Sequence, residues 1–217
     1  MSKTNQVLKK KTTKSKNQSN GQQSYGWYLV ATGGAGLIAS FWLALERLAS
    51  LADPDRVALC DINPILSCGS VMDSAQASLF GIPHSFLGIA IFSALITVGV
   101  VLLAGAKLSS WFWQALLLGS LVGFLSVQYL VYQSLFVLNT LCPWCMVIWV
   151  SVVPLLFLTS GYIAKHKLVS FQNSAIEKTV VFMSKHAFTI TALWFIAVIY
   201  MIVVQFWHYW STVILFF

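Results

Sequence analysis

The sequence predicts an all-α integral membrane protein with five spanning helices, and three observations lead to this fold class. The 217 residues are 58% hydrophobic but only 9% charged, whereas a soluble domain carries about 25% charged residues. Charged residues are absent from three long runs, residues 74–106, 108–164 and 186–217. Five apolar stretches reach the length of about 20 residues that a helix needs to cross a bilayer. The apolar surface therefore faces lipid rather than water.

The first 24 residues differ from the rest, because they are polar, basic and rich in Ser, Asn and Gln. They lack the apolar core of a cleavable signal peptide. Since this composition buries too little surface to fold, we predict a disordered basic tail over residues 1–24. Residues 25–217 then form one transmembrane domain. Its helices are predicted over residues 25–45, 85–106, 111–137, 143–164 and 187–210.

The placement of charge predicts the orientation of these helices. Six of the 13 basic residues lie in the tail, one lies between the second and third helices, and four lie between the fourth and fifth. The loop over residues 46–84 holds five of the six acidic residues. Because basic residues mark the cytoplasmic side, we expect a cytoplasmic N-terminus in a plasma membrane, with this loop and the C-terminus outside. Basic charge so placed is a topology signal and does not predict a nucleic-acid partner.

The outer loop over residues 46–84 is too long for a simple connector. It contains an Asp-Pro, an Asn-Pro and a Gly-Ile-Pro sequence, which are all turn signals. Between these turns, residues 71–80 mix apolar and small polar side chains. This mixture favours a short helix lying across the outer mouth of the bundle.

All four cysteines fall on the outer side of the predicted topology. Cys60 and Cys68 lie in the outer loop, and Cys142 and Cys145 lie at the start of the fourth helix. The outside of a bacterial membrane is oxidising, so disulfides persist there. Four cysteines allow three pairings, and a relay would use more than one of them in turn.

The sequence Cys142-Pro143-Trp144-Cys145 is a C-x-x-C motif at a predicted helix N-terminus. Proline suits the first helical position, because its missing N–H has no partner there. Cys142 is then the N-cap, where unpaired amides and the helix dipole favour a thiolate. Cys145 follows one turn deeper and on the same side, so the two sulfurs can bridge. The motif therefore predicts a reactive thiol pair.

Three other functions compete with a redox role for the cysteines. A structural zinc site would use all four, but the spacing between Cys60 and Cys68 is unusual for zinc, and no metal is expected. A static disulfide inside a C-x-x-C motif would close too short a loop to be a useful staple. A transporter or channel with structural disulfides usually needs ionisable residues inside the membrane, and none lies deep in these helices.

Three elements of the sequence resemble the vitamin K epoxide reductase family. The first is the loop pair CDINPILSC at residues 60–68, with the family's separation of the two cysteines. The second is GIPHSFLG at residues 81–88, which leads into the second helix, and the third is LCPWC at residues 141–145. Their order, spacing and topology match the family over about residues 27–163. The Pro-Trp between the last two cysteines looks like the bacterial branch.

The resemblance implies a four-helix bundle around a quinone, with a fifth transmembrane helix beside it. Cys60 would exchange with a soluble partner, Cys68 would bridge transiently to Cys142, and Cys145 would pass electrons to the quinone. The quinone would be menaquinone, ubiquinone or a vitamin K-like molecule, and the enzyme would support disulfide bond formation. Asp61, beside Cys60, either tunes that thiol or is only solvated.

The resemblance also implies a partner. Many bacterial members carry a thioredoxin-like domain after the fifth helix, whereas this chain stops at Phe217. We therefore expect a separate extracytoplasmic thioredoxin-like or DsbA-like protein. The quinone-linked DsbB family is the nearest alternative, but it places its C-x-x-C motif in the first outer loop, and the order here is inverted.

Five residues are candidates for contact with the quinone. His84 and Ser85 begin the second helix near the cysteines, where the resemblance implies polar groups that contact the quinone, although an interfacial histidine touching water is the alternative. Trp149 lies one helical turn beyond the second cysteine of the motif. It would pack on the ring, or it is only a core tryptophan. Met72 and Phe80 are candidates to close the pocket from the loop.

Overall fold

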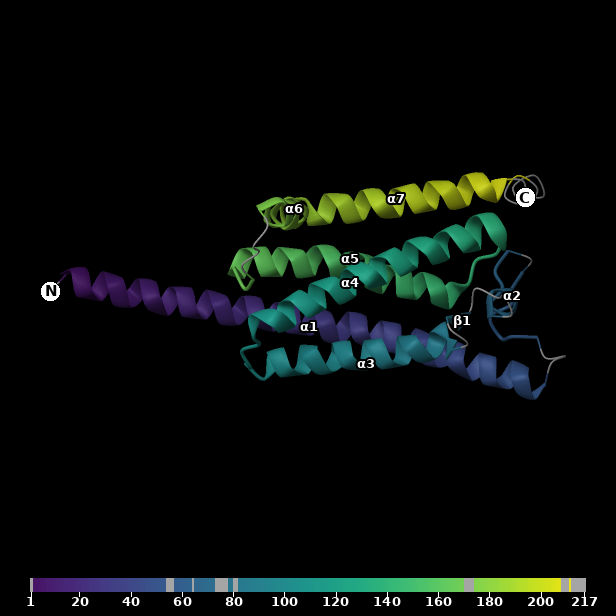
Figure 1. Cartoon of the computed structure of the whole chain (residues 1–217), viewed down its shortest axis with the longest axis horizontal. Helices are drawn as coiled ribbons and strands as arrows, with labels where there is room; N and C mark the ends of the chain where they lie inside the picture. Colours follow the sequence, from purple (N-terminus) through teal and green to yellow (C-terminus); the bar gives the residue numbers. More distant parts are fainter. Residues whose placement is uncertain are drawn as a thin grey trace.

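The computed structural model describes residues 2–53, 57–63, 65–72, 78–79, 82–169, 174–207 and 211. Within these ranges five helices are long and apolar enough to span a membrane, which confirms the predicted all-α membrane fold. They run side by side along the long axis of the molecule (Figure 1). The spanning segments are Asn20–Ala52, His84–Leu103, Ser110–Val137, Pro143–His166 and Ala187–Gln205.

The elements that contain these segments follow one another in a simple order. The long helices are α1 (Ser2–Ala52), α3 (His84–Leu103), α4 (Ser110–Tyr132), α5 (Pro143–His166) and α7 (Ala187–Gln205). The short elements are α2 (Gly69–Met72), β1 (Ser78–Leu79), β2 (Ile82–Pro83), the π-helix η2 (Gln133–Val137) and α6 (Ser174–Lys185). The two strands pair antiparallel.

The first helix differs from its prediction at both ends. It begins at Ser2, so the tail that the sequence predicts as disordered is helical here. The physical reason is that residues 2–52 contain no proline, and the Lys and Gln residues of the tail are good helix formers. The helix also continues to Ala52, so the first part of the predicted outer loop is helical.

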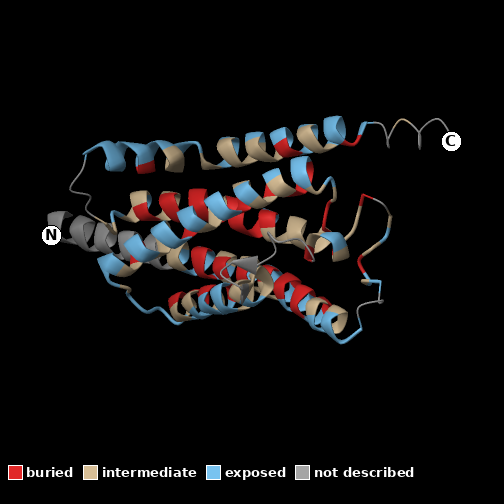
Figure 2. Ribbon diagram, turned by 45° about the vertical axis from the view of Figure 1, so that its right-hand side comes forward, coloured by how far each residue is buried: buried red, intermediate tan, exposed pale blue. Residues whose placement is uncertain are grey.

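Helix α5 is the centre of the bundle. It packs against α1, α4, α6 and α7, while α3 pairs along its length with α1. Close approach of α1 and α3 depends on small residues, because a Cβ at Gly99 would lie 2.9 Å from the carbonyl oxygen of Gly26. Buried residues line the middle of the bundle, and exposed ones cover its outer surface (Figure 2).

The last two helices of the described part lie on one side of this bundle. Helix α6 was not predicted; it buries Val180 and packs against α5. Helix α7 is tied to the bundle by two side-chain hydrogen bonds. The Trp194 indole donates to Oε1 of Gln128 at 3.1 Å, and the Gln205 amide donates to Oδ1 of Asn139 at 2.8 Å. The second bond joins α7 to the turn before the C-x-x-C motif.

This turn reverses the chain between α4 and α5. Helix α4 passes into η2, and the hydroxyl of Ser134 donates to the carbonyl oxygen of Thr140. The Thr140 N–H donates in return to the carbonyl oxygen of Ser134 at 3.1 Å. Asn139 has a φ of 53°, in the left-handed region that asparagine tolerates better than most residues. The turn brings the start of α5 beneath the outer loop.

Candidate functional site

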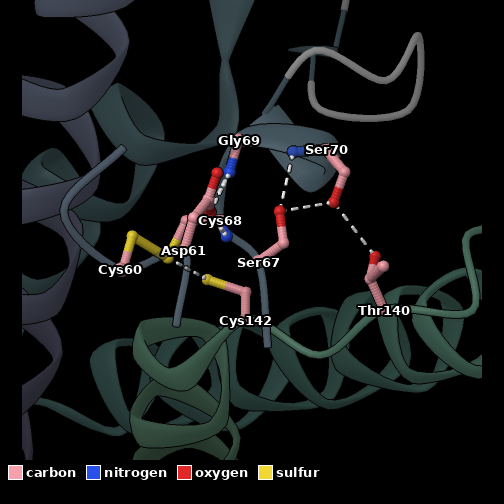
Figure 3. The surroundings of a disulfide bond; sticks show 8 residues. All are labelled: Cys60, Asp61, Ser67, Cys68, Gly69, Ser70, Thr140 and Cys142. Carbon is pink, nitrogen blue, oxygen red and sulfur yellow. Dashed lines mark hydrogen bonds between the residues drawn. A yellow bond between two sulfur atoms is a disulfide. The ribbon is translucent and has the colours of Figure 1, made fainter. Parts of the chain in front are cut away.

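The outer loop folds down onto the N-terminal end of α5 and carries a disulfide there (Figure 3). Cys60 and Cys68 are bonded to each other, with their Cα atoms 5.7 Å apart. Cys60 is 7% exposed and Cys68 is fully buried. Of the short helix predicted over residues 71–80, residues 71 and 72 are helical, at the end of α2, whereas residues 78 and 79 form strand β1 and the others lie outside the described residues. Because Cys60 and Cys68 are bonded to each other, their sulfurs are not thiolate ligands for a four-cysteine zinc site.

A backbone bridge fixes the loop to the segment before the C-x-x-C motif. Leu66 and Leu141 form an isolated parallel β-bridge. The Leu141 N–H donates to the carbonyl oxygen of Ile65 at 2.7 Å, and the Ser67 N–H donates to that of Leu141 at 3.0 Å. Cys68 directly follows Ser67, and Cys142 directly follows Leu141. The bridge therefore brings these two cysteines together although 74 positions separate them.

Two side chains complete the turns of the loop. Oδ1 of Asn63 accepts hydrogen bonds from the amides of Ile65 and Leu66, at 3.0 and 2.8 Å. Oδ1 of Asp61 accepts hydrogen bonds from the amides of Cys68 and Gly69 (Figure 3). These contacts fix the turns of the loop, and its Ile65 side chain is buried in the core of the bundle.

The thiol of Cys142 lies against the disulfide. Its Sγ is 3.4 Å from Sγ of Cys68, and its side chain is almost completely buried. Cys142 and Cys145 are both free. Since a disulfide has a sulfur–sulfur distance of about 2 Å, a displacement of little more than 1 Å would join Cys68 to Cys142. The arrangement therefore suits thiol–disulfide exchange between the two pairs.

The surroundings of Cys142 favour its reactive form. Cys142 is the N-cap of α5 and Pro143 occupies the first turn, as predicted. Hydrogen bonding by the Cys145 thiol, and then by the backbone amides of Cys145 and Trp144, lowers the pKa of Cys142. Burial and the charge of Asp61 oppose this shift. The thiolate is the form that exchanges with disulfides, so Cys142 is poised for exchange.

Apolar side chains enclose the sulfurs. Leu43 of α1 and Met72 of α2 form one buried cluster with Cys60, Cys68 and Cys142. The ring of Trp144, inside the C-x-x-C motif, stacks on Trp42 of α1 with centroids 5.4 Å apart. Met72 therefore lies in the same buried cluster as these cysteines.

The other predicted quinone contacts lie around the start of α3 and on α5. His84 is the first residue of α3, and its Nδ1 is buried without a hydrogen-bond partner. Ser85 follows it and is half-buried. Trp149 is 3% exposed, and its indole N–H is also buried and unpaired. Phe80 lies outside the described residues.

The sequence analysis missed one further polar group, the hydroxyl of Ser40. It is fully buried without a hydrogen-bond partner, and it faces α3 closely at Gly88. Ser40 lies one turn inward from Leu43, as Cys145 lies one turn inward from Cys142, so the two are at similar depth. Buried polar atoms usually have partners. Ser40, His84 and Trp149 are therefore buried polar groups whose hydrogen-bonding capacity is free for a ligand.

A helical membrane bundle with a buried disulfide beside a reactive thiol pair defines a membrane thiol oxidoreductase. The pattern of the vitamin K epoxide reductase family matches residues 27–160, which include α3, α4, most of α5 and all four cysteines. This chain belongs to the vitamin K epoxide reductase family. It is accordingly a multi-pass membrane protein.

Two curated relatives are similar over the same region. Vitamin K epoxide reductase complex subunit 1 of Mus musculus is 30% identical over 141 residues, which cover 61% of this chain and 87% of the relative. The Rattus norvegicus protein of the same name is 28% identical over 142 residues, which cover 62% and 88%.

Proposed function

We propose that this protein relays electrons from a reduced thioredoxin-like or DsbA-like partner, through two cysteine pairs, to a quinone. Net oxidation of the partner would support disulfide bond formation outside the membrane. The observation that carries the proposal is the 3.4 Å distance between Sγ of Cys142 and Sγ of Cys68, which joins the loop pair to the helix pair. The free Cys142 and Cys145 beside a closed Cys60–Cys68 bond correspond to the stage after electrons have reached the inner pair.

The first exchange takes place at the loop pair. A thiolate of the partner attacks Sγ of Cys60, the Cys60–Cys68 bond breaks, and Cys68 leaves as a thiolate. The partner's second thiol then attacks its own bonded sulfur and releases Cys60. The partner is left as a disulfide, and the loop pair has gained two electrons and two protons. Because Cys60 is 7% exposed, the partner must displace its cover to reach it.

The second exchange moves the electrons to the helix pair. Cys68 attacks Cys142 in an oxidised Cys142–Cys145 pair, and Cys145 leaves as a thiolate. Cys60 then attacks Cys68, which restores the Cys60–Cys68 bond and releases Cys142. The hydrogen bonds that lower the pKa of Cys142 also make it a good leaving group in this step.

Cys145 is the residue that we assign to electron transfer out of the protein. It lies one turn deeper along α5 than Cys142. A quinone of the menaquinone, ubiquinone or vitamin K type supplies an acceptor for two electrons and two protons. Ser40, His84 and Trp149 would hold it by hydrogen bonds and ring packing, with Ser85 and Met72 at its edge.

The orientation belongs to the same proposal. Eleven of the 13 basic residues fall on the side of the N-terminus, which basic residues mark as cytoplasmic. All four cysteines and the C-terminus would then be outside. After mild reduction of intact cells, a membrane-impermeant thiol reagent should label Cys60. Labelling that requires permeabilised cells would show the opposite orientation.

An anaerobic assay tests the function directly. The purified full-length protein is mixed with a reduced thioredoxin-like protein and a soluble quinone analogue, and quinol formation is followed by absorbance. We expect one quinol for each partner disulfide formed, and no turnover when either component is left out. A transporter with structural disulfides would instead be indifferent to quinone, and partner oxidation without quinol formation would contradict the proposed acceptor.

A further inference from the structure

We propose that Asp61 is a positioning residue, whose carboxylate holds Cys68 in register with Cys142 for thiol exchange. This inference rests on the proposed relay, because it concerns the step that joins the two cysteine pairs. The hydrogen bonds of Asp61 go to backbone amides and not to a thiol. Its role would act through the backbone of Cys68.

The hydrogen bonds of Asp61 end at the residue whose sulfur must be placed. Oδ1 accepts from the Cys68 amide at 2.7 Å and from the Gly69 amide at 3.0 Å. These amides stand at the start of α2, where a helix has no partners of its own for its first N–H groups. Hydrogen bonds to a charged acceptor are stronger than those between neutral groups. The carboxylate therefore fixes the backbone on the far side of Cys68.

Cys68 is thus held between two anchors. On its N-terminal side, the Ser67 N–H donates to the carbonyl oxygen of Leu141, next to Cys142. On its C-terminal side, Asp61 holds the amides of Cys68 and Gly69 (Figure 3). The bridge at Leu141 places the chain, and Asp61 fixes the direction in which the Cys68 side chain leaves it.

Gly69 gives independent support, because it leaves room for the carboxylate. A Cβ at this position would lie 2.9 Å from Oδ2 of Asp61, closer than real Cβ contacts. A side chain at residue 69 would therefore push the carboxylate away from the amides. The absence of a side chain at Gly69 therefore allows the carboxylate of Asp61 to reach the two amides.

The charge of Asp61 argues for positioning rather than for activation of a thiol. A carboxylate near Cys142 raises the pKa of that thiol, against the larger lowering by Cys145 and the α5 amides. A residue that served only to activate Cys142 would carry the opposite charge. The benefit of positioning Cys68 therefore has to outweigh the unfavourable effect of the Asp61 charge on the pKa of Cys142.

The test measures how readily Cys68 and Cys142 join. In a full-length Cys60→Ala/Cys145→Ala background only these two cysteines remain, and their effective concentration follows from the disulfide fraction in glutathione buffers of known composition. Adding Asp61→Ala should lower this value by about tenfold, the effect of losing a charge-assisted hydrogen bond. Asp61→Asn keeps an oxygen acceptor at the same place and should restore it to within about threefold of the background.

Two further variants protect the test against simple misfolding. Gly69→Ala should lower the effective concentration although Asp61 is intact. Ser70→Ala removes exposed hydroxyl bonds to Ser67 and Thr140 from the same short helix, and it should stay within about twofold of the background. Matching thermal unfolding curves in detergent would show that all variants share the fold.

Three results would overturn the role of Asp61. They are an unchanged value for Asp61→Ala, an equal loss for Asp61→Asn and Asp61→Ala, and an unchanged value for Gly69→Ala. The proposed relay would survive each of them. The relay itself fails under a different result, in which Cys68 and Cys142 form no disulfide even when Asp61 is present.

Discussion

The two ends of the bundle are built on different principles. At the end near the start of the first spanning segment, rings from α1, α4 and α5 pack on one another. Tyr25 and Tyr162 stack with centroids 4.4 Å apart, and Trp113 lies 5.1 Å from Tyr162. The Tyr25 hydroxyl is hydrogen-bonded to Thr159 at 2.7 Å inside the core. We call this region the aromatic end.

At the opposite end, which contains the four cysteines, hydrogen bonds of the loop add to a small apolar cluster around the sulfurs. One β-bridge, the side chains of Asp61 and Asn63, and a disulfide hold the loop on α5. The aromatic end locks the helices together, so the sulfurs at the cysteine end can exchange partners by small local movements. The comparison predicts that substitutions at one end change chemistry and that substitutions at the other change stability.

The largest expected effect is that of Cys145→Ser. Quinone reduction should fall by at least about a thousandfold, because the variant lacks the thiol that hands on the electrons. The Cys60–Cys68 bond should still be reduced by the partner, as measured by alkylation and mass spectrometry. Quinol formation at the wild-type rate would remove Cys145 from its assigned role.

A smaller effect is expected on the titration of Cys142. Its pKa is lowered first of all by hydrogen bonding from Cys145. In a Cys60→Ala/Cys68→Ala background, adding Cys145→Ala should therefore move the midpoint of the alkylation rate of Cys142 to higher pH. Cys145→Ser retains a hydroxyl donor and serves as the matched control, with a smaller shift. A midpoint that moves to lower pH would contradict the assigned cause.

The smallest effect on chemistry is expected at the aromatic end. Tyr25→Phe leaves the buried hydroxyl of Thr159 without its partner and should lower the free energy of unfolding by about 1–2 kcal/mol. Quinone reduction by the folded variant should remain within about twofold of wild type. Tyr129→Phe, at an exposed tyrosine, should change neither quantity. A large loss of activity in folded Tyr25→Phe would show that the two ends are coupled.

The sequence predicts the helices well, because hydrophobic length is a local property. The spanning segments, the N-cap at Cys142 and the proline after it all follow from neighbouring residues. Helix α6 was missed because its short apolar pattern is interrupted by Lys178 and Glu177. The tail was predicted as disordered because its composition lacks a core, whereas the helix has no proline to end it.

The site could be predicted only as a set of cysteines. Its geometry depends on the pairing of Leu66 with Leu141, and no local pattern specifies hydrogen bonds between segments so far apart. The π-helix and the positive φ of Asn139 lie in the turn that leads into Leu141. The buried hydroxyl of Ser40 was missed for the same reason, because its burial depends on the close approach of α3.

The central claim, that Cys68 and Cys142 join the two pairs, is tested most directly by the Cys60→Ala variant. Without Cys60, the thiol that releases Cys142 from Cys68 is missing. Cys145 could still displace Cys68 by attacking Cys142, but quinone keeps one disulfide among the three remaining cysteines, and the 3.4 Å distance between Sγ of Cys68 and Sγ of Cys142 favours the bridge between these two. Non-reducing peptide mapping should therefore find a Cys68–Cys142 disulfide in most molecules. Finding only Cys142–Cys145 disulfides, with Cys68 free under oxidising conditions, would contradict the relay.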